Sequence, residues 1–507
     1  MSEVSNCAVK LNNISKSFGT VQANKDVCIE LRRGEILALL GENGSGKTTL
    51  MNMLSGIYYP DSGEIYVDGK EVIIRSPKDA FDLGIGMIHQ HFKLVDVLTA
   101  AENIILGLKG SVLINRKKLA SEIREISDKY GFSLDPNKKI YEMSVSEKQK
   151  VEIVKVLYRG ADVLILDEPT AVLTPQEADT LFEMLRSMKN DGKAIIIITH
   201  KLNEVLSLSD RVCILRKGEL VGELETKDAS VKSLTEGMVG RSVSLEIQRE
   251  AGALGKERII VSSLTCLNSD GLKALDDISF KLHEGEILGI AGIAGSGQKE
   301  LCEAITGLYP VEGGSITYIN DDEPSELCGL TPTQIAKKGV HLAFVPEDRL
   351  GMGLVAGLDM IENMMLKSYN NEKGFLINRK LPKSTAERLI DSLEIVTPGV
   401  STPVRRLSGG NVQKVLLGRE IDSGPSVLVV AYPVRGLDIN SSYTIYNLLN
   451  EQRKNGVAVL FVGEDLDVLL ELCDRIMVLC GGRLSGIVNA PTATKEELGI
   501  LMTHMSD

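Results

Sequence analysis

The sequence predicts an α/β fold in which one domain occurs twice in tandem. The chain of 507 residues is too long for a single hydrophobic core and has room for two or three domains. Short segments recur in the same order at a nearly constant distance. Within each half, β-rich sequence comes first, a charged helical stretch follows, and apolar runs then alternate with helical patterns.

The repeat also predicts the domain boundaries. Three recurring segments define it, namely Gly-Glu-Ile-Leu at 34–37 and 285–288 (285 − 34 = 251), Leu-Ile-Asn-Arg-Lys at 113–117 and 376–380 (376 − 113 = 263), and Asp-Arg at 210–211 and 474–475 (474 − 210 = 264). The second copy thus has about 13 additional residues (264 − 251 = 13), and we expect most of them in a larger loop around 320–333. The polar, small-residue stretch at 248–256 is typical of a linker. We therefore predict domains at residues 1–245 and 246–507.

Composition excludes several classes of function. The net charge of −12 argues against a nucleic-acid partner, because phosphate contacts need a basic face. The eight cysteines include no C-x-x-C pair, so neither a zinc site nor a disulfide framework is indicated, and reduced thiols are expected. No signal peptide and no apolar run of membrane-spanning length are found. If a membrane is involved, we expect the chain to reach it through a partner.

A glycine-rich phosphate-binding loop is the strongest motif. The run Gly-Glu-Asn-Gly-Ser-Gly-Lys-Thr-Thr fits G-x-x-x-x-G-K-[ST] and stands between a predicted buried strand and a predicted helix. Its backbone N–H groups and the helix N-terminus favour a phosphate chain, Lys47 can reach the β- and γ-phosphates, and Thr48 can offer its hydroxyl to Mg²⁺. An ordinary glycine turn before a helix would not require that Lys and Thr. The residues expected to bind nucleotide here are Gly41, Glu42, Asn43, Gly44, Ser45, Gly46, Lys47, Thr48 and Thr49.

Polar residues follow three further apolar runs. Asp167 and Glu168 end the run at 163–166, where Asp167 can hold Mg²⁺ through water and Glu168 can polarise the attacking water. The alternative, that the two acids only cap a strand end, suits an isolated pair better than one that accompanies a phosphate loop. His200 can bond the γ-phosphate, although a histidine at a strand end is more often structural. Gln90 can complete the Mg²⁺ shell and move when phosphate leaves.

These motifs, in this order, resemble the nucleotide-binding domain of an ABC ATPase, and the resemblance covers the chain twice. It implies two tandem P-loop ABC ATPase domains, each with a RecA-like α/β core, an antiparallel β subdomain and a helical lobe. It also implies ATP and Mg²⁺ as cofactors. The implied roles are Walker A for Lys47 and Thr48, the Q-loop for Gln90, Walker B with the catalytic glutamate for Asp167 and Glu168, the switch histidine for His200, the D-loop for 170–174, and adenine stacking for Phe18.

The same resemblance sorts these residues by function. The Mg²⁺ ligands would be Thr48, Gln90 and Asp167, and the catalytic residues would be Glu168, His200, Lys47 and Gln90. Phe18 fits a core position at a strand end equally well.

The family's signature, Leu-Ser-Gly-Gly-Gln at the start of a helix, is altered in the first half. Ser144 remains, but Val145 and Ser146 replace both glycines, and their side chains impede close backbone approach. Glu147 adds negative charge near a phosphate. In the second half the signature is nearly intact, with Ser408, Gly409, Gly410 and Asn411, and a well-formed D-loop follows at 435–438.

The second half has lost its other motifs. Gln298 stands where Lys47 was and Lys299 where Thr48 was, so the second loop lacks both key side chains. The remaining replacements are Ala431 for Asp167, Tyr432 for Glu168, Glu464 for His200 and Glu347 for Gln90. Hydrolysis at this loop is not expected, because the loss of any one of these groups costs orders of magnitude in rate.

The altered motifs of both halves fall at the same predicted ATP site. In the ABC ATPases that this chain resembles, two domains pair head to tail, so that each ATP lies between the Walker motifs of one domain and the signature of the other. The first half's Walker motifs would face Ser408, Gly409 and Gly410, whereas Gln298 and Ala431 would face the altered first signature. Independent drift of two sites would not sort the defects so cleanly. We expect one complete, hydrolytic site per chain.

Two domains without membrane spans and the Gly-Gln-Lys-Glu run in the second loop resemble ATPases of bacterial carbohydrate-class uptake systems. The runs at 86–96, 171–176 and 433–438 resemble the nucleoside-import branch, of a guanosine or purine nucleoside type. The implied location is the cytoplasmic face of the cell membrane. The implied partners are multi-span permease subunits, of which we expect two, and an extracellular solute-binding (lipo)protein, with no nucleic acid and no direct solute contact.

Three alternatives stay open. The solute could be a simple sugar or riboflavin-like. A soluble, ribosome-associated tandem ATPase would normally keep both sites intact and join them by a long charged linker. The second half could also act as a regulatory binding module, which is compatible with import.

Overall fold

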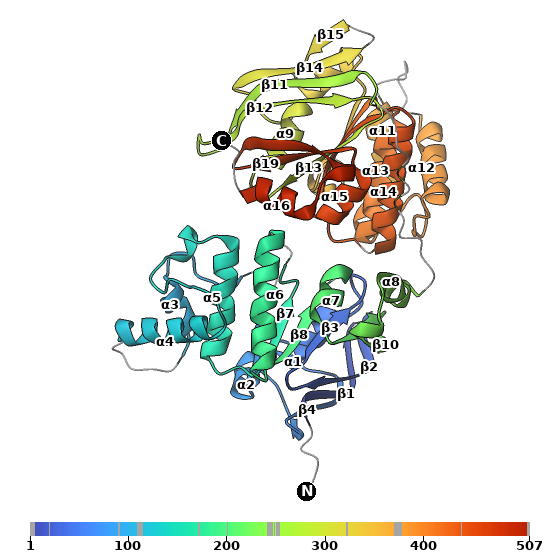
Figure 1. The fold of residues 1–507 in the computed structure, drawn as a ribbon. Coiled ribbons are helices and arrows are strands. Elements are labelled where there is room, and N and C mark those ends of the chain that lie inside the picture. Colours follow the sequence, from blue (N-terminus) through green and yellow to red (C-terminus); the bar gives the residue numbers. More distant parts are fainter. Residues whose placement is uncertain are drawn as a thin grey trace. The chain divides into compact units, whose positions relative to one another are not determined.

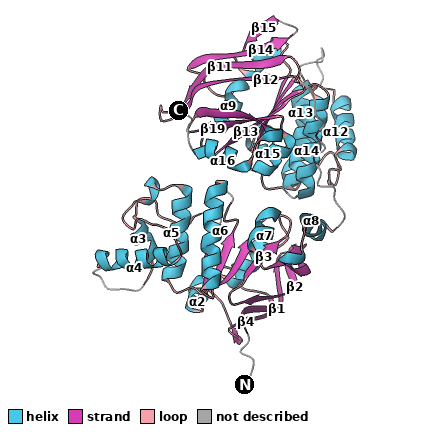
Figure 2. Ribbon diagram, viewed as in Figure 1, coloured by secondary structure: helices cyan, strands magenta, loops and turns pink. Residues whose placement is uncertain are grey.

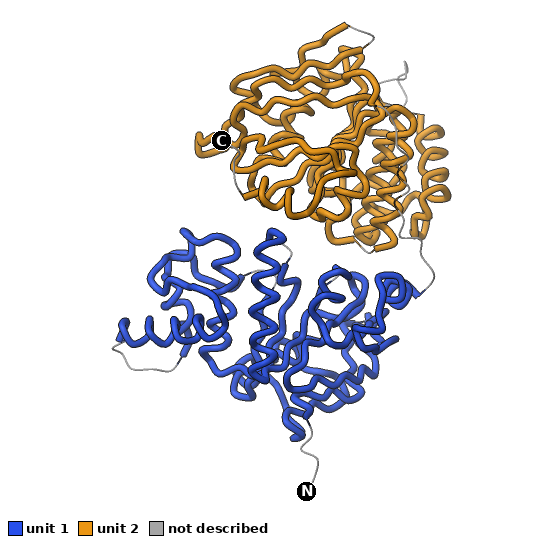
Figure 3. The backbone as a smooth tube through the Cα atoms, viewed as in Figure 1, with its two compact units in different colours: residues 1–244 blue, residues 245–507 orange. Residues whose placement is uncertain are grey.

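The computed structural model describes residues 6–19, 21–89, 92–108, 115–170, 173–199, 201–240, 247, 249, 254–320, 323–369, 378–437 and 439–503. The chain consists of two compact units, residues 1–244 and 245–507 (Figure 3). Each unit contains a six-stranded sheet, a four-stranded sheet and surrounding helices (Figure 2). In the part of the chain described, no helix combines the length and the apolar character needed to cross a bilayer.

The main sheet of unit 1 has the strand order β10-β9-β3-β8-β7-β6, with β10 antiparallel and the other strands parallel. Its parallel strands are buried on both faces, which explains their continuous apolar sequences. The strands are β3 (Ile36–Leu40), β6 (Ile85–Ile88), β7 (Val163–Asp167), β8 (Ala194–Ile198), β9 (Arg211–Arg216) and β10 (Glu219–Glu225). A second, antiparallel sheet has the order β2-β1-β4-β5 and contains β1 (Cys7–Phe18), β2 (Val21–Arg32), β4 (Ser62–Val67) and β5 (Lys70–Val72).

Helices cover both faces of the main sheet. Val163 and Ile165 join the apolar cluster that contains α1 and the four-stranded sheet, whereas Leu164 and Leu166 face the cluster of α5 and α6. Figure 1 shows α3, α4 and α5 grouped away from β1, β2 and β4, as a separate helical lobe. The helices are α1 (Lys47–Leu54), α2 (Pro77–Asp82), α3 (Ala100–Ile105), α4 (Arg116–Lys129), α5 (Val145–Tyr158), α6 (Pro175–Asn190), α7 (Leu202–Leu208) and α8 (Val231–Val239).

Unit 2 repeats this architecture. Its sheets have the orders β16-β17-β18-β13-β19-β20 and β12-β11-β14-β15. The strands are β11 (Glu257–Leu267), β12 (Lys273–His283), β13 (Ile287–Gly292), β14 (Gly313–Asn320), β15 (Glu323–Glu326), β16 (Leu342–Val345), β17 (Val427–Ala431), β18 (Ala458–Val462), β19 (Arg475–Cys480) and β20 (Arg483–Asn489). The helices are α9 (Gln298–Ile305), α10 (Pro332–Lys337), α11 (Met360–Ser368), α12 (Lys380–Ser392), α13 (Gly409–Asp422), α14 (Ile439–Lys454), α15 (Leu466–Leu472) and α16 (Lys495–Thr503). The predicted tandem α/β fold, with its β subdomains and helical lobes, is confirmed.

The expected position of the extra residues in the second copy is wrong. From β4 and β14 to α2 and α10 the offset between copies rises only from 251 (313 − 62) to 255 (332 − 77), so the region around 320–333 takes about four residues. The offset then reaches 260 at α3 and α11 (360 − 100) and 264 at α5 and α13 (409 − 145). The additional residues therefore enter at several surface loops, which accept insertions at small cost.

Candidate functional site

The loop between β3 and α1 is wound so that only glycine fits at two positions. Gly41 and Gly46 have φ values of 155° and 100°. A Cβ at Gly41 would lie 2.3 Å from the carbonyl oxygen of Leu215, and one at Gly46 would lie 2.3 Å from that of Ala23. The Gly218 N–H also donates to the Ser45 carbonyl at 3.0 Å. The backbones of β2 and of the β9–β10 turn thus pack closely against the phosphate loop and fix its conformation.

Lys47 is buried at the start of α1 and folds back over this loop. Its ammonium group donates to the carbonyl oxygens of Gly41 at 2.7 Å and Glu42 at 2.9 Å. Burial lowers the pKa of Lys47, and the negative charges of Glu168 and Asp167 oppose that shift. A phosphate chain in the loop would meet a cation that the protein has already placed there.

The two acids at the end of β7 lie beside the loop. Burial raises the pKa of Asp167 to about 6, with a further contribution from the charge of Glu168, while Lys47 and a hydrogen bond from Thr48 oppose the rise. Glu168 adopts φ 47°, a left-handed conformation that is uncommon for a residue with a side chain, and its N–H donates to the Ile198 carbonyl at 2.8 Å. The structure therefore brings Lys47, Thr48, Asp167 and Glu168 together.

The donor set suits a hard divalent cation. The Thr48 hydroxyl and the Asp167 carboxylate are in direct contact, and both present oxygen atoms of the kind that Mg²⁺ prefers. These two residues would hold the ion. Two predicted residues, Gln90 and His200, lie outside the described residues, as do the D-loop positions 171, 172 and 438.

Phe18 is not a core residue. Its side chain lies at the end of β1 with 44% relative exposure, and its ring packs edge-on against Tyr58 at a centroid distance of 5.1 Å. The ammonium group of Lys16 lies 5.6 Å from the Phe18 ring centroid. Tyr58 was not predicted from the sequence, because no motif links it to Phe18 and only the packing of the loop after α1 brings the two rings together.

The signature of unit 1 is occupied by its own side chains. Ser144 caps α5 and accepts from the Glu147 N–H at 3.2 Å, while the Ser144 N–H donates to the Glu147 carboxylate at 2.8 Å. The Lys138 ammonium group donates to both carboxylate oxygens of Glu147 at 2.8 Å. Although partial burial raises the pKa of Glu147, the bonds from Lys138 and Ser144 hold it below its usual value. A carboxylate thus already occupies the helix N-terminus where a phosphate would bind.

The signature of unit 2 lacks such a carboxylate. Ser408 caps α13, and its oxygen accepts from the Asn411 side-chain amide at 2.9 Å. The Asn411 carbonyl oxygen in turn accepts from the Val396 N–H at 3.0 Å. A Cβ at Gly409 would have Arg349 as its nearest neighbour, at 3.4 Å. The contrast with Glu147 is the physical difference between the two signatures.

The second phosphate loop keeps its backbone without its cation. Gly297 has φ 98°, close to the 100° of Gly46. The buried Gln298 amide donates to the Ile293 carbonyl at 3.1 Å, and Ile293 stands where Glu42 stands in unit 1 (293 − 251 = 42). A neutral amide therefore replaces the Lys47 ammonium group in the same fold-back position. Lys299 points away, 3.8 Å from Glu303 on the same helix.

An ion-pair network fills the place of the remaining motifs in unit 2. Tyr432 replaces Glu168 with the same left-handed backbone, φ 48°, and the same N–H bond, to Val462 at 3.0 Å. The Arg435 guanidinium lies 5.9 Å from the Tyr432 ring centroid, pairs closely with Glu347 and lies 3.1 Å from Glu464. Burial raises the pKa of the Tyr432 phenol well above its usual range. Arg435 was predicted only as the first residue of the D-loop at 435–438, and its ion pairs with the two glutamates join segments that follow three different strands.

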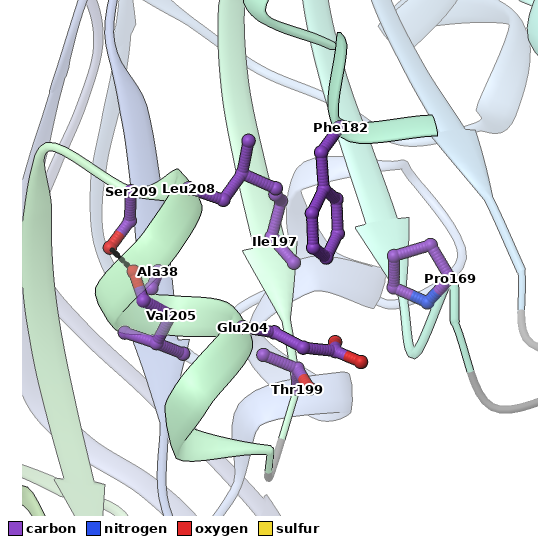
Figure 4. Close-up of a pocket in the computed structure, with 9 residues that line it drawn as sticks. All are labelled: Ala38, Pro169, Phe182, Ile197, Thr199, Glu204, Val205, Leu208 and Ser209. Atoms are coloured by element: carbon purple, nitrogen blue, oxygen red, sulfur yellow. Dashed lines mark hydrogen bonds between the residues drawn. The ribbon is translucent and has the colours of Figure 1, made fainter. Parts of the chain in front are cut away.

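A further polar group lies beside the Walker B segment of unit 1. A pocket borders Pro169, Thr199 and Glu204, and Figure 4 shows the Glu204 side chain reaching from α7 toward Pro169. Apart from Glu204 the pocket is lined mostly by apolar side chains of α6, α7, β3 and β8. No motif in the sequence pointed to Glu204.

Comparisons with known proteins place these features in context. A family model described as "ABC transporter" matches residues 24–171 and 275–433. The chain is 43% identical over 500 residues to the guanosine import ATP-binding protein NupO of Bacillus subtilis (strain 168), with 97% of each chain covered. It is also 43% identical over 501 residues to the nucleoside import ATP-binding protein NupA of Lactococcus lactis subsp. cremoris (strain MG1363), again with 97% of each covered. Identity to the ribose import ATP-binding protein RbsA 1 of Streptomyces avermitilis is 38% over 493 residues, covering 97% of this chain and 92% of that protein.

Proposed function

The chain belongs to the ABC transporter family and is an ATPase that energises an importer, and we propose that the imported solute is a nucleoside. Support for this solute comes from the higher identity to the guanosine and nucleoside import proteins, 43%, than to the ribose import protein, 38%. The kinship with import ATP-binding proteins does not support the alternative of a ribosome-associated ATPase.

ATP hydrolysis is assigned to the Walker motifs of unit 1. The observation that carries this assignment is the cluster of Lys47, Thr48, Asp167 and Glu168 around one glycine-lined loop. Lys47 would hold the β- and γ-phosphates, and the loop N–H groups would bind the phosphate oxygens. Glu168 would orient the attacking water and accept its proton, and His200 would bond the γ-phosphate. Adenine would stack on Phe18.

Magnesium is the proposed metal. Thr48, Asp167 and Gln90 would hold Mg²⁺, which when bound neutralises charge on the β- and γ-phosphates. Thr48 and Asp167 would contribute two adjacent oxygen donors. A bound cation would stabilise the charged form of the Asp167 carboxylate and so lower its pKa from about 6.

The signature that completes this site is proposed to be that of unit 2. Ser408, Gly409, Gly410 and Asn411 form the N-terminus of α13 and include no carboxylate among them, whereas Glu147 fills the equivalent position in unit 1. The second composite site would combine that filled signature with the Gln298 loop. Two negative side chains, Glu347 and Glu464, would also face the phosphates there. We infer one hydrolytic site per chain.

The import ATP-binding relatives imply membrane permease partners. We propose two multi-span subunits and an extracellular solute-binding protein, with the chain on the cytoplasmic face of the membrane and no contact with the solute. Closure of the two units around ATP would drive the permease, and hydrolysis would reopen them.

The test combines turnover with uptake. The transporter purified with its permease subunits should lose ATPase activity by at least about 100-fold when it carries Glu168→Gln. Cells that express the complete system should take up labelled guanosine, and excess unlabelled nucleoside should compete. Uptake of ribose without uptake of any nucleoside would replace the proposed solute with a sugar.

A further inference from the structure

A polar cluster connects the Walker B segment of unit 1 with the start of α7. The Thr170 hydroxyl donates to the Glu204 carboxylate at 2.7 Å. The Lys201 ammonium group donates to the Thr170 carbonyl at 3.2 Å and lies 3.2 Å from the Glu204 carboxylate. Thr170 is 2% exposed, and the Glu204 side chain is 17% exposed. We call Thr170, Lys201 and Glu204 the Thr170 cluster.

The position of the cluster in the chain relates it to hydrolysis. Thr170 follows the proposed general base Glu168 by two residues, and Lys201 directly follows the proposed switch histidine His200. The cluster therefore joins the two segments that carry these side chains. The turn at Glu168 has a left-handed backbone, which persists only where several contacts hold it. Besides the cluster, the Gln149 amide on the signature helix donates to the Pro169 carbonyl at 2.7 Å.

Unit 2 shows that the fold does not need the Thr170 cluster. The two units share a constant offset of 264 from β7 onward, since β17 begins at 427 (427 − 163 = 264) and α15 at 466 (466 − 202 = 264). At that offset Val434, Asp465 and Val468 replace the cluster, and both valines pack partly buried against the apolar core. The backbone of the turn is nevertheless retained, as Tyr432 has the φ value and the N–H bond of Glu168.

Two other ion pairs of unit 1, unlike the Thr170 cluster, recur in unit 2. The Arg211–Glu35 pair at 2.9 Å recurs as Arg475–Glu286 at 2.7 Å. The pair of Lys189 with Asp210 likewise recurs as Arg453 with Asp474. Because these ion pairs occur in both units, they support the fold that the two units share. The Thr170 cluster occurs only in the unit that also has the Walker acids.

We propose that Glu204, acting through Thr170 and Lys201, positions Glu168 and the His200 segment for ATP hydrolysis. This inference rests on the proposed assignment of hydrolysis to unit 1. Thr170, Lys201 and Glu204 belong neither to the phosphate loop nor to the Walker acids, so the cluster would act through the residues beside it. An apolar pair of similar volume would fill the space but would leave the turn and the switch segment without a polar link.

The double variant Thr170→Val/Glu204→Val tests this directly, because it gives unit 1 the side chains that unit 2 has at these positions. In the purified transporter with its permease subunits, we expect kcat to fall by about 10- to 100-fold, since small displacements of catalytic groups cost that much. The KM for ATP and the melting temperature should stay near the wild-type values. Exposed positions on α6 provide matched controls, Thr180→Val and Glu183→Gln, which should leave kcat unchanged.

Three outcomes discriminate among the explanations. A double variant that folds and keeps kcat within twofold, while Glu168→Gln is inactive, overturns the positioning role and leaves the assignment of hydrolysis intact. An active Glu168→Gln variant overturns the assignment of hydrolysis itself. If the double variant is unstable, Thr170→Val alone replaces it, because it removes the hydroxyl that donates to Glu204 at nearly the same side-chain volume. Unchanged kcat in Thr170→Val would then refute the proposal.

Discussion

Replacement of the signature serine in each unit separates a structural role from a catalytic one. Ser408 and Ser144 are both N-caps of 14-residue helices, and each accepts a backbone N–H three residues on, at 3.4 Å and 3.2 Å. Loss of an N-cap costs about 1 kcal/mol, and a positive side chain at a helix N-terminus adds about 0.3–1 kcal/mol. Ser408→Arg and Ser144→Arg should therefore reduce stability by a similar amount, about 1–2 kcal/mol.

Their effects on turnover should differ. If Ser408 donates to the γ-phosphate bound at unit 1, its loss should lower kcat by about 100- to 1,000-fold, the effect of removing one preorganised donor. Ser144 is enclosed by Glu147 and contributes no such donor, so Ser144→Arg should keep most of the activity. The assay is steady-state ATPase activity of the purified transporter, with chemical denaturation to compare stability. Equal loss of activity in both variants would refute the one-site account, since the altered interface would then also have to close around nucleotide.

Three further predictions follow from the geometry of the two loops and of the second unit. Gly46→Ala should abolish ATP binding, because the new Cβ would lie 2.3 Å from the Ala23 carbonyl oxygen. As a control, the new Cβ in Gly44→Ala would meet no atom within 4 Å, so this variant should lose only about 1–2 kcal/mol of stability through left-handed backbone strain. Calorimetric ATP titration compares the two variants. Asp167→Asn should raise the melting temperature of the nucleotide-free chain at pH 7.5 although it removes turnover. The folded-state pKa of Asp167, about 6, lies above the ordinary 3.8, so the contribution of Asp167 to stability is lost as pH rises through 6, and the advantage of the variant should vanish near pH 4. Arg435→Gln should change stability by less than about 1 kcal/mol, because its ion pairs are half exposed, and should leave kcat within twofold; a large loss of turnover would show that the second unit's network takes part in catalysis.

Local sequence was sufficient to predict the conformation of the phosphate loop. The stretch at 41–49 combines a strand, a glycine turn and a helix that are contiguous in the chain, so the conformation follows from the residues themselves. The same holds for the tandem repeat and for the buried strands, whose apolar runs leave little choice of environment. The predicted position of the extra residues was wrong because the recurring segments show that residues were inserted between them but not in which loops.

Contacts between distant segments were not predictable in this way. Glu147 was identified as a charge near a phosphate, but its capture by Lys138 and Ser144 depends on how the chain before α5 folds back onto the helix. Tyr58 and Glu204 belong to no motif, and the D-loop motif does not predict the ion pairs of Arg435, since each of the three residues gains its role from partners in other elements.

The sequence by itself determined that this protein has two copies of one nucleotide-binding fold, one with a complete set of Walker residues and the other without. Those conclusions depend on residue type and on spacing within single elements. Only the tertiary structure decided which side chains occupy the altered sites: a carboxylate at the first signature, an amide in the second phosphate loop, and an arginine between two glutamates. The physical reason is that side-chain hydrogen bonds and ion pairs act over about 3 Å, and only the folded backbone brings such distant residues within that range.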